Sequence, residues 1–262
     1  MIDLNKLVAI AENEQKIYEA GKTDGYNEGY DIGIIEGIAE GRTAEHEEFW
    51  ENALKDDNWQ DRFSGTCWNN KTFRPTKDIK VGAYANYCFA QNGITDMVAL
   101  LEECGITLDT SGITVRGDGM FNYNQNITTV PYIDLSNAEG GFGLNQMFTQ
   151  CTKLHTIVGL RVRDDGTDKW SSAFSGCSAL VNITIYGVIG QSVSVSAAKK
   201  LSKDSIISFM THLSDTATEM KITFSTQAIK SAFNIPVDAD IESNTEWMAI
   251  RNTKLNWQVA YA

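Results

Sequence analysis

Few side chains in this chain have the type and spacing that catalysis or metal binding needs. The three histidines, His46, His155 and His212, are isolated, and none has an evident partner for general acid–base work. The five cysteines include no C-x2-C pair, and no histidine stands at zinc-ligand spacing from any of them. The sequence therefore predicts a non-enzymatic protein with no catalytic residues, no cofactor and no metal site.

Two short motifs resemble ligand sites but lack a required residue. Ala20-Gly-Lys-Thr looks like the end of a phosphate-binding loop, yet Lys16 stands five residues before Gly21, where such a loop needs glycine. Asp164-Asp165-Gly166-Thr167-Asp168 has carboxylates at spacing that could hold calcium, but it lacks the later glutamate of a calcium-binding hand. We interpret this stretch as a solvated loop, and calcium binding there stays open.

Cations and one aromatic side chain surround this acidic loop. The set is His155, Arg161, Arg163, Lys169 and Trp170. Such a mixture suits a carbohydrate or an anionic surface polymer, so we take it as a candidate ligand-binding set. The alternative is that these are ordinary exposed residues and that Trp170 packs beneath the next phenylalanine.

One apolar template occurs three times around these residues. Its copies start 27 and 26 residues apart, a period typical of leucine-rich repeats. Its members are Phe121, Asn124, Ile127 and Val130; Phe148, Cys151, Leu154 and Ile157; and Phe174, Cys177, Leu180 and Ile183. The twelfth and fourteenth residues after each Phe extend the register: Ile133 and Leu135, Leu160 and Val162, Tyr186 and Val188.

The template predicts a stack of repeats, because one unit of this size cannot bury its apolar face alone. The three-residue steps suit a tight turn, and the alternating pair suits a short strand with one buried face. We expect an α/β fold: a short leucine-rich-repeat solenoid at 61–200. Cys151 and Cys177 share one template position, and we interpret them as small buried apolar residues. Stacked metal ligands or a disulfide are the alternative.

The C-terminal part, 201–262, predicts a mixed α/β cap that shields the last repeat. Ser202 can cap a helix whose apolar residues have helical spacing. Further elements are expected as a strand at 220–224, short helices at 226–233 and 245–252, and a closing strand at 256–261.

The N-terminal segment, 1–60, predicts a long helix with a stripe of glycines. They recur every four residues: Gly21, Gly25, Gly29, Gly33, Gly37 and Gly41. A second stripe of Tyr26, Tyr30, Ile34 and Ile38 has the same spacing. Because six glycines cost an isolated helix on the order of 5 kcal/mol relative to alanine, this helix needs a partner that packs into the glycine groove.

We therefore predict a homo-oligomer held by these helices. The groove and the ridge lie about 100° apart on the helix, so the ridge of one chain can fill the groove of the next around a ring. This favours a cyclic homotrimer. A flexible glycine-rich linker is the alternative interpretation.

Charge is unevenly distributed along the chain. Residues 1–61 carry 16 acidic and 5 basic side chains, whereas residues 62–262 carry 18 and 17. With no clustered basic stripe, nucleic-acid binding is not indicated. The beginning of the sequence lacks a basic cluster followed by an apolar core, and no run approaches a membrane span of about 20 apolar residues. We expect a chain that folds in a cytoplasm, without a secretory signal and without membrane insertion.

Several segments resemble a known family. Phe148-Thr-Gln-Cys-Thr-Lys-Leu-His-Thr-Ile and Ala173-Phe-Ser-Gly-Cys-Ser-Ala-Leu-Val-Asn-Ile are similar to the BspA-like class of leucine-rich repeats. Glu47-Glu-Phe-Trp-Glu-Asn, Phe63-Ser-Gly-Thr-Cys-Trp, Thr72-Phe-Arg-Pro-Thr-Lys-Asp-Ile, Gly187-Val-Ile-Gly and Lys254-Leu-Asn-Trp-Gln-Val resemble such proteins encoded by gut bacterial phages and prophages near tail genes. The resemblance covers about residues 44–262, and the first copy departs from it with Asn124 in place of cysteine.

This resemblance implies a tail fibre or tail-tip attachment protein that binds a receptor. It implies a virion location, assembly in the host cytoplasm, and a bacterial surface glycan or protein as the receptor. We also expect the N-terminus, which the resemblance does not cover, to join other tail or virion proteins. The alternative is a structural subunit of a virion or tail-like particle with no receptor role.

Overall fold

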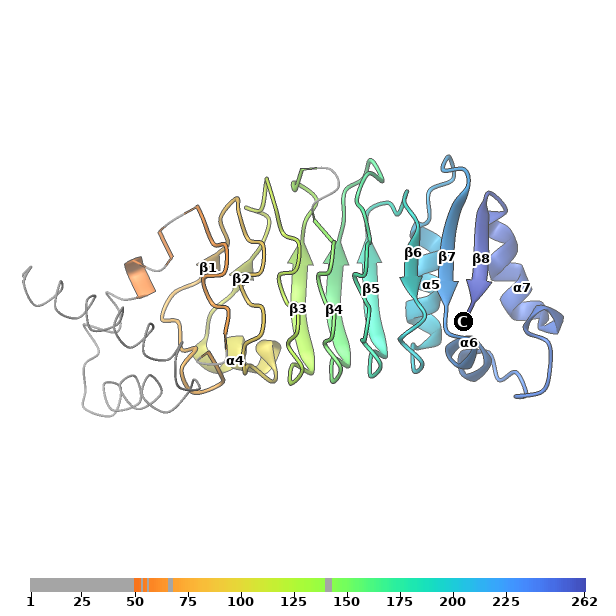
Figure 1. Ribbon diagram of the computed structural model, residues 1–262, viewed down its shortest axis with the longest axis horizontal. Helices are drawn as coiled ribbons and strands as arrows, with labels where there is room; N and C mark the ends of the chain where they lie inside the picture. The colour runs from red at the N-terminus through yellow and green to blue at the C-terminus, as the bar shows by residue number, and fades with distance from the viewer. Residues whose placement is uncertain (1–49, 53, 56, 66–67, 140–142) are drawn as a thin grey trace, which may run out of the picture.

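The protein has mixed α/β content, and its elements follow one another along one long axis (Figure 1). The computed structural model describes residues 50–52, 54–55, 57–65, 68–139 and 143–262. The strands are β1 (Ile79–Lys80), β2 (Leu108–Asp109), β3 (Thr129–Asp134), β4 (Thr156–Arg161), β5 (Asn182–Tyr186), β6 (Val193–Val195), β7 (Met220–Phe224) and β8 (Trp257–Tyr261). The helices are α4 (Met97–Cys104), α5 (Lys203–His212), α6 (Thr226–Ala232) and α7 (Thr245–Arg251), with short 3-10 turns at Ile241–Ser243 and Asn252–Lys254.

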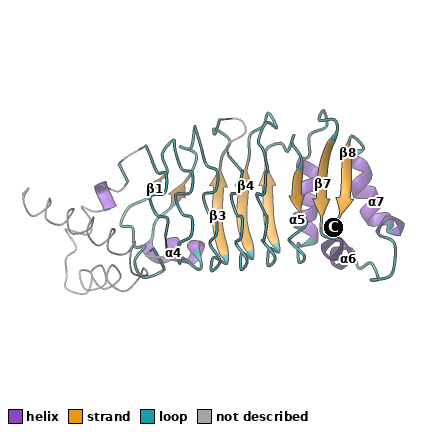
Figure 2. Ribbon diagram, viewed as in Figure 1, coloured by secondary structure: helices purple, strands orange, loops and turns teal. Residues whose placement is uncertain are grey.

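All the described strand pairs are parallel. They form the sheets β1-β2, β3-β4-β5 and β6-β7-β8, each in chain order. Parallel neighbours need a crossover between them, and within the sheet β3-β4-β5 the returning chain is a turn segment that carries one phenylalanine of the template. We call one turn segment with its following strand a repeat. Helices gather toward the two ends of the described chain, and the middle consists of strands and turns (Figure 2).

A column of stacked phenylalanine rings runs through the core. Neighbouring ring centroids are 5.6 to 5.8 Å apart and the rings are tilted by 9° to 14°. The column consists of Phe63, Phe89, Phe121, Phe148 and Phe174, all at most 1% exposed. Such pairs contribute beyond the apolar area that they bury. The column is thus two rings longer than the template of the sequence predicted.

Two of the five rings escaped the sequence template for a simple reason. Phe89 is followed by Asn92, as Phe121 is by Asn124, but 32 residues separate the two rings instead of 26 or 27. The additional chain forms α4, which begins where Asp96 accepts a hydrogen bond from the Ala99 amide at 3.0 Å. An inserted helix therefore hides the period without interrupting the stack.

The turn segments are joined by a regular ladder of backbone hydrogen bonds. At each interface the amides of the Phe and of the residues two before and two after it donate to carbonyls of the next repeat. Between the second and third phenylalanines these bonds are Tyr87 to Asp118, Phe89 to Met120 and Gln91 to Asn122, at 2.8 to 3.1 Å. The ladder fixes each turn on its neighbour and fulfils the requirement that buried amides be paired.

Asparagine and cysteine have the same function at the template position that they share, which is to contact a phenylalanine carbonyl of the preceding repeat. Cys151 Sγ lies 2.9 Å from the Phe121 carbonyl oxygen, and Cys177 Sγ lies 3.0 Å from that of Phe148. Asn124 Nδ2 donates to the Phe89 carbonyl at 2.6 Å. Burial raises the pKa of Cys151 to about 12, so its thiol keeps the proton that it donates. Both cysteines are free and buried, which confirms their interpretation as core residues.

Helix α5 replaces a strand at the outer edge of β5. Ser205 Oγ accepts from the Ile183 amide at 2.9 Å, and Ser208 Oγ accepts from the Ile185 amide at 2.8 Å. Serines three apart lie on one helix face, which matches amides two apart on a strand edge. The edge that would otherwise stay unpaired is thereby closed.

The elements expected in the C-terminal part are confirmed. Ser202 caps α5 through the Ser205 amide, and β7, α6, α7 and β8 occur at the expected places within one residue of their bounds. One contiguous apolar core extends from Trp50 to Trp257, so this part packs onto the repeats. No described helix is both long and apolar enough to cross a membrane.

Phe148→Ala should lower the free energy of unfolding by about 3 to 5 kcal/mol, because it leaves a cavity between two stacked rings. Urea denaturation of the full chain measures the loss. Val237→Ala is the control, since Val237 is 91% exposed and its truncation should change stability by no more than about 0.5 kcal/mol. Equal losses in both variants would contradict a core role for the column.

Ser205→Ala and Ser208→Ala should each destabilise the protein by about 1 to 3 kcal/mol, because each leaves a strand amide without an acceptor. Hydrogen exchange should accelerate at the amides of Ile183 and Ile185. Ser194→Ala removes an exposed serine of β6 and serves as the control. Unchanged exchange at both amides would show that the serines do not close the strand edge.

Candidate functional site

The outward face of the sheet β3-β4-β5 carries exposed apolar and aromatic side chains. Tyr132, Val158 and Tyr186 are 40%, 49% and 41% exposed. Their strand neighbours Ile133 and Ile185 are fully buried, as expected where side chains alternate between a core and a solvent face. We call Tyr132, Val158, Gly159 and Tyr186 the tyrosine face.

The outward position of Tyr186 corrects the sequence template, which placed this residue inward. Ile157 pairs with Ile183 but Leu160 pairs with Ile185, so β4 has one residue more than β5 between the two pairs. A shift of one residue moves a strand side chain to the opposite face. Ile185 therefore fills the core position in the third copy, and Tyr186 points to solvent.

Gly159 lies between the two tyrosines and makes room for them. Tyr132 and Tyr186 belong to strands two apart, which corresponds to about 9.6 Å between their backbones. Their ring centroids are nevertheless 5.7 Å apart, at an interplanar angle of 64°. A Cβ on Gly159 would lie 2.6 Å from Tyr132 Cδ2 and 3.0 Å from Tyr186 Cε2. The rings thus lean together over the glycine and form one aromatic surface.

Charged groups lie at the end of this face. Asp134, Arg161 and Tyr186 are in register across the three strands. Arg161 forms an ion pair with Asp164 at 2.9 Å. Burial, followed by the charge of Asp134, raises the pKa of Tyr132, so its phenol stays protonated and can donate a hydrogen bond at neutral pH. The face offers aromatic contact with hydroxyl donors beside a cation, a combination that suits binding of a partner.

The structure separates the ligand set predicted from the sequence. His155 and Lys169 are exposed, and His155 Nδ1 lies 3.0 Å from Thr156 Oγ1. Arg161 borders the tyrosine face, as described above. Arg163 turns to the acidic loop, where its Nε lies 3.0 Å from Asp165 Oδ2 and its Nη1 donates to the Ala138 carbonyl.

Trp170 does not contribute to an exposed surface. It is 3% exposed, and its ring stacks on that of Phe174 with centroids 6.1 Å apart and an interplanar angle of 29°. Packing of Trp170 beneath the next phenylalanine is the alternative that the sequence leaves open, and the structure confirms it. Trp170 stands four residues before the template residue Phe174. Its indole therefore packs on the column of phenylalanine rings and is buried.

Each carboxylate of the acidic loop interacts with a different group of the protein. Asp164 pairs with Arg161, Asp165 pairs with Arg163, and Asp168 Oδ2 accepts from the Arg163 amide at 2.9 Å. Asp168 is 1% exposed, and burial raises the pKa of its carboxyl. Across the described ranges, no cluster of three or more His, Cys, Asp or Glu side chains could hold a metal ion.

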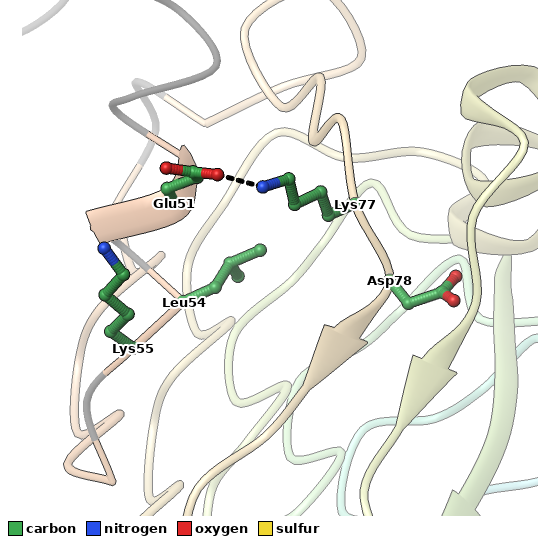
Figure 3. Close-up of a pocket in the computed structure, with 5 residues that line it drawn as sticks. All are labelled: Glu51, Leu54, Lys55, Lys77 and Asp78. Atoms are coloured by element: carbon green, nitrogen blue, oxygen red, sulfur yellow. Dashed lines mark hydrogen bonds and ion pairs between the residues drawn. The ribbon is translucent and has the colours of Figure 1, made fainter.

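A shallow depression lies at the N-terminal end of the described chain (Figure 3). Glu51, Leu54, Lys55, Lys77 and Asp78 line it, and Glu51 pairs with Lys77 across it. Asp78 Oδ1 accepts from the Thr107 amide at 2.7 Å. Its charges have both signs, and those of Glu51 and Lys77 neutralise each other.

The predicted oligomerisation residues all lie outside the described part of the chain. They are Gly21, Gly25, Gly29, Gly33, Gly37, Gly41, Tyr26, Tyr30, Ile34 and Ile38. The helix, its glycine stripe and the trimer therefore stay predictions.

Comparison with known proteins gives no relative. No protein family model matches the chain, and no curated protein and no solved structure matches it either.

Gly159→Ala should destabilise the protein by about 1 to 3 kcal/mol, because the added methyl group overlaps the Tyr132 ring and the backbone there needs no left-handed conformation. In a Tyr132→Ala background most of this penalty should disappear. A double-mutant cycle by urea denaturation should therefore give a coupling energy of about 0.5 to 3 kcal/mol. Val158→Ala is the control, and additivity within error between positions 159 and 132 would contradict the contact.

Proposed function

We propose that this chain is a non-enzymatic attachment protein of a phage tail and that its tyrosine face contacts a receptor on the bacterial surface. In this proposal the repeats form a leucine-rich-repeat solenoid, and the residues beyond α5 cap its end. The similarity of the repeat segments and their flanks to BspA-like proteins encoded near tail genes supports the phage setting.

The observation that carries the binding role is the exposed pair Tyr132 and Tyr186 on a rigid sheet. Tyrosines are enriched at interfaces because they supply a large contact area at a low cost in conformational entropy. Here the sheet and Gly159 hold both rings before any partner arrives, which lowers the ordering cost of binding. Arg161 beside them adds a cation of the type also enriched in binding hot spots.

The geometry favours recognition of a macromolecular surface over binding of an enclosed small molecule. The tyrosine face is the open side of a sheet, whereas pockets for small ligands bury most of their ligand. One such face offers few contacts. The predicted oligomer would present several copies together, so that weak contacts add up to attachment.

A cell-binding experiment tests this function. The full chain, fluorescently labelled, is incubated with a panel of gut bacteria beside a Tyr132→Ala/Tyr186→Ala variant. We expect the wild type to bind at least one strain and the variant to lose at least tenfold in affinity, because two interface aromatics commonly contribute more than 1 kcal/mol each.

Leu255→Ala is the control, since Leu255 is 80% exposed and lies just before β8, away from the sheet β3-β4-β5. It should bind as the wild type does. Thermal unfolding of all three proteins separates lost contact from lost folding. Absence of binding by the wild type would contradict the attachment role and favour a structural virion subunit. Equal binding by wild type and double variant would exclude the tyrosine face.

A further inference from the structure

The turn segments repeat an unusual backbone conformation. In every repeat the residues two before and two after the stacked phenylalanine have a positive φ, between 54° and 96°. The preceding positions are Asp61, Tyr87, Gly119, Gln146 and Ser172; the following ones are Gly65, Gln91, Tyr123, Gln150 and Gly176. Seven of these ten positions hold a residue other than glycine, although glycine adopts this conformation with less strain.

The side chains at these positions are therefore not explained by the turn itself. Glycine would form the same backbone, as Gly119, Gly65 and Gly176 do in equivalent places. Tyrosine and glutamine are instead held where the backbone disfavours them. Strained conformations of this kind concentrate at functional sites, which favours a role in binding for these side chains.

Four of the five turns contain a segment without charged residues, whereas the first turn holds Asp61 and Arg62. Segments 84–92, 119–126, 144–152 and 170–179 contain no Asp, Glu, Lys, Arg or His. The other parts of the repeats hold the charges, for example Lys153, Arg161 and Asp164. Core side chains of the turns and of the strands point into one shared core, so their outward sides lie on different surfaces of the molecule. We call the outward side of the four uncharged segments the turn face.

Hydrogen bonds organise the centre of the turn face across three repeats. Tyr87 Oη donates to Gln146 Oε1 at 3.2 Å, and Asn122 Nδ2 donates to the same oxygen at 3.3 Å. Asn122 is 6% exposed, and its Oδ1 is buried without a hydrogen-bond partner. The Tyr87 ring lies where a Cβ of Gly119 would be, 2.3 Å from Cε1. Tyr87 thus spans one repeat to reach Gln146, and an acceptor stays unused beside this contact.

We propose that the turn face binds an uncharged glycan chain that runs across successive repeats. Sugar hydroxyls both donate and accept hydrogen bonds, and so do the amides and hydroxyls of this face. Tyr123, 49% exposed, offers an aromatic plane beside them. The phenylalanine rings recur every 5.6 to 5.8 Å, so equivalent groups are presented at a regular interval along the stack.

Other partners fit this surface less well. An anionic polymer needs cations, and the four segments of the turn face hold none; the bordering Lys153 is engaged by Asn126 Oδ1 at 2.8 Å. The centre of a protein interface is usually apolar, whereas the turn face displays amides, hydroxyls and phenols. The inference goes beyond the proposed attachment function, because it concerns a different surface from the tyrosine face and names the ligand class.

The test uses the full chain and the variant Gln91→Gly/Tyr123→Gly/Gln150→Gly, which keeps the hydrogen bonds of Gln146 to Tyr87 and Asn122. Affinity electrophoresis measures retardation in gels that contain dextran, mannan, galactan or anionic polygalacturonate. At least one neutral polymer should retard the wild type, and the variant should bind it at least tenfold more weakly. Because glycine relieves the left-handed strain, the melting temperature of the variant should stay unchanged or rise by a few degrees.

A lower melting temperature would assign these side chains a structural role and overturn the inference. The same holds if none of the three neutral polymers retards the wild type, if the variant binds as the wild type does, or if polygalacturonate is preferred. Binding to cells that is lost in the variant and abolished by protease but not by periodate oxidation would indicate a protein partner and also overturn it. The Tyr132→Ala/Tyr186→Ala variant should keep its polymer binding, which separates this test from that of the attachment function.

Discussion

The column of phenylalanine rings is the interaction on which the rest of this structure depends. Each ring stacks on the next at 5.6 to 5.8 Å, which joins successive repeats through one continuous contact. Because these phenylalanines are fully buried, their backbone carbonyls and amides are buried as well and need hydrogen-bond partners. The backbone ladder pairs the amides, and the Asn or Cys side chains of Asn124, Cys151 and Cys177 donate to the carbonyls.

This constraint also explains why a change of residue type can preserve the fold. Asn124 stands where the next two copies have cysteine, a departure from the residue type of the template. Amide and thiol share the property that matters here, a proton directed at the phenylalanine carbonyl of the preceding repeat. The thiol remains a donor because burial holds its pKa far above neutrality. A side chain of similar volume without a donor would leave that carbonyl unsatisfied.

Once the interior is fixed, the two outer surfaces can differ in chemistry. The strand side carries aromatic rings and charges, with Tyr132 and Tyr186 closed over Gly159. The turn side carries amides, hydroxyls and phenols on a backbone that would accept glycine. Neither surface contributes to the stacked core. Each can therefore be adapted to a partner with little effect on the fold, which suits a protein whose proposed role is attachment.

The sequence by itself determined the apolar register of the first two copies and of the first four positions of the third, the buried state of Cys151 and Cys177, and the elements after residue 201, because burial and helix capping follow from local spacing. It did not reveal Phe63 and Phe89 as members of the same column, since α4 lengthens one interval. Among the candidate site residues, the sequence left Trp170 open between a ligand set and packing beneath the next phenylalanine, and the structure shows the packing. Only the tertiary structure decided which strand residues face outward. A single extra residue in β4 moved Tyr186 to the surface beside Tyr132, and this depends on the pairing of strands that lie far apart in the chain.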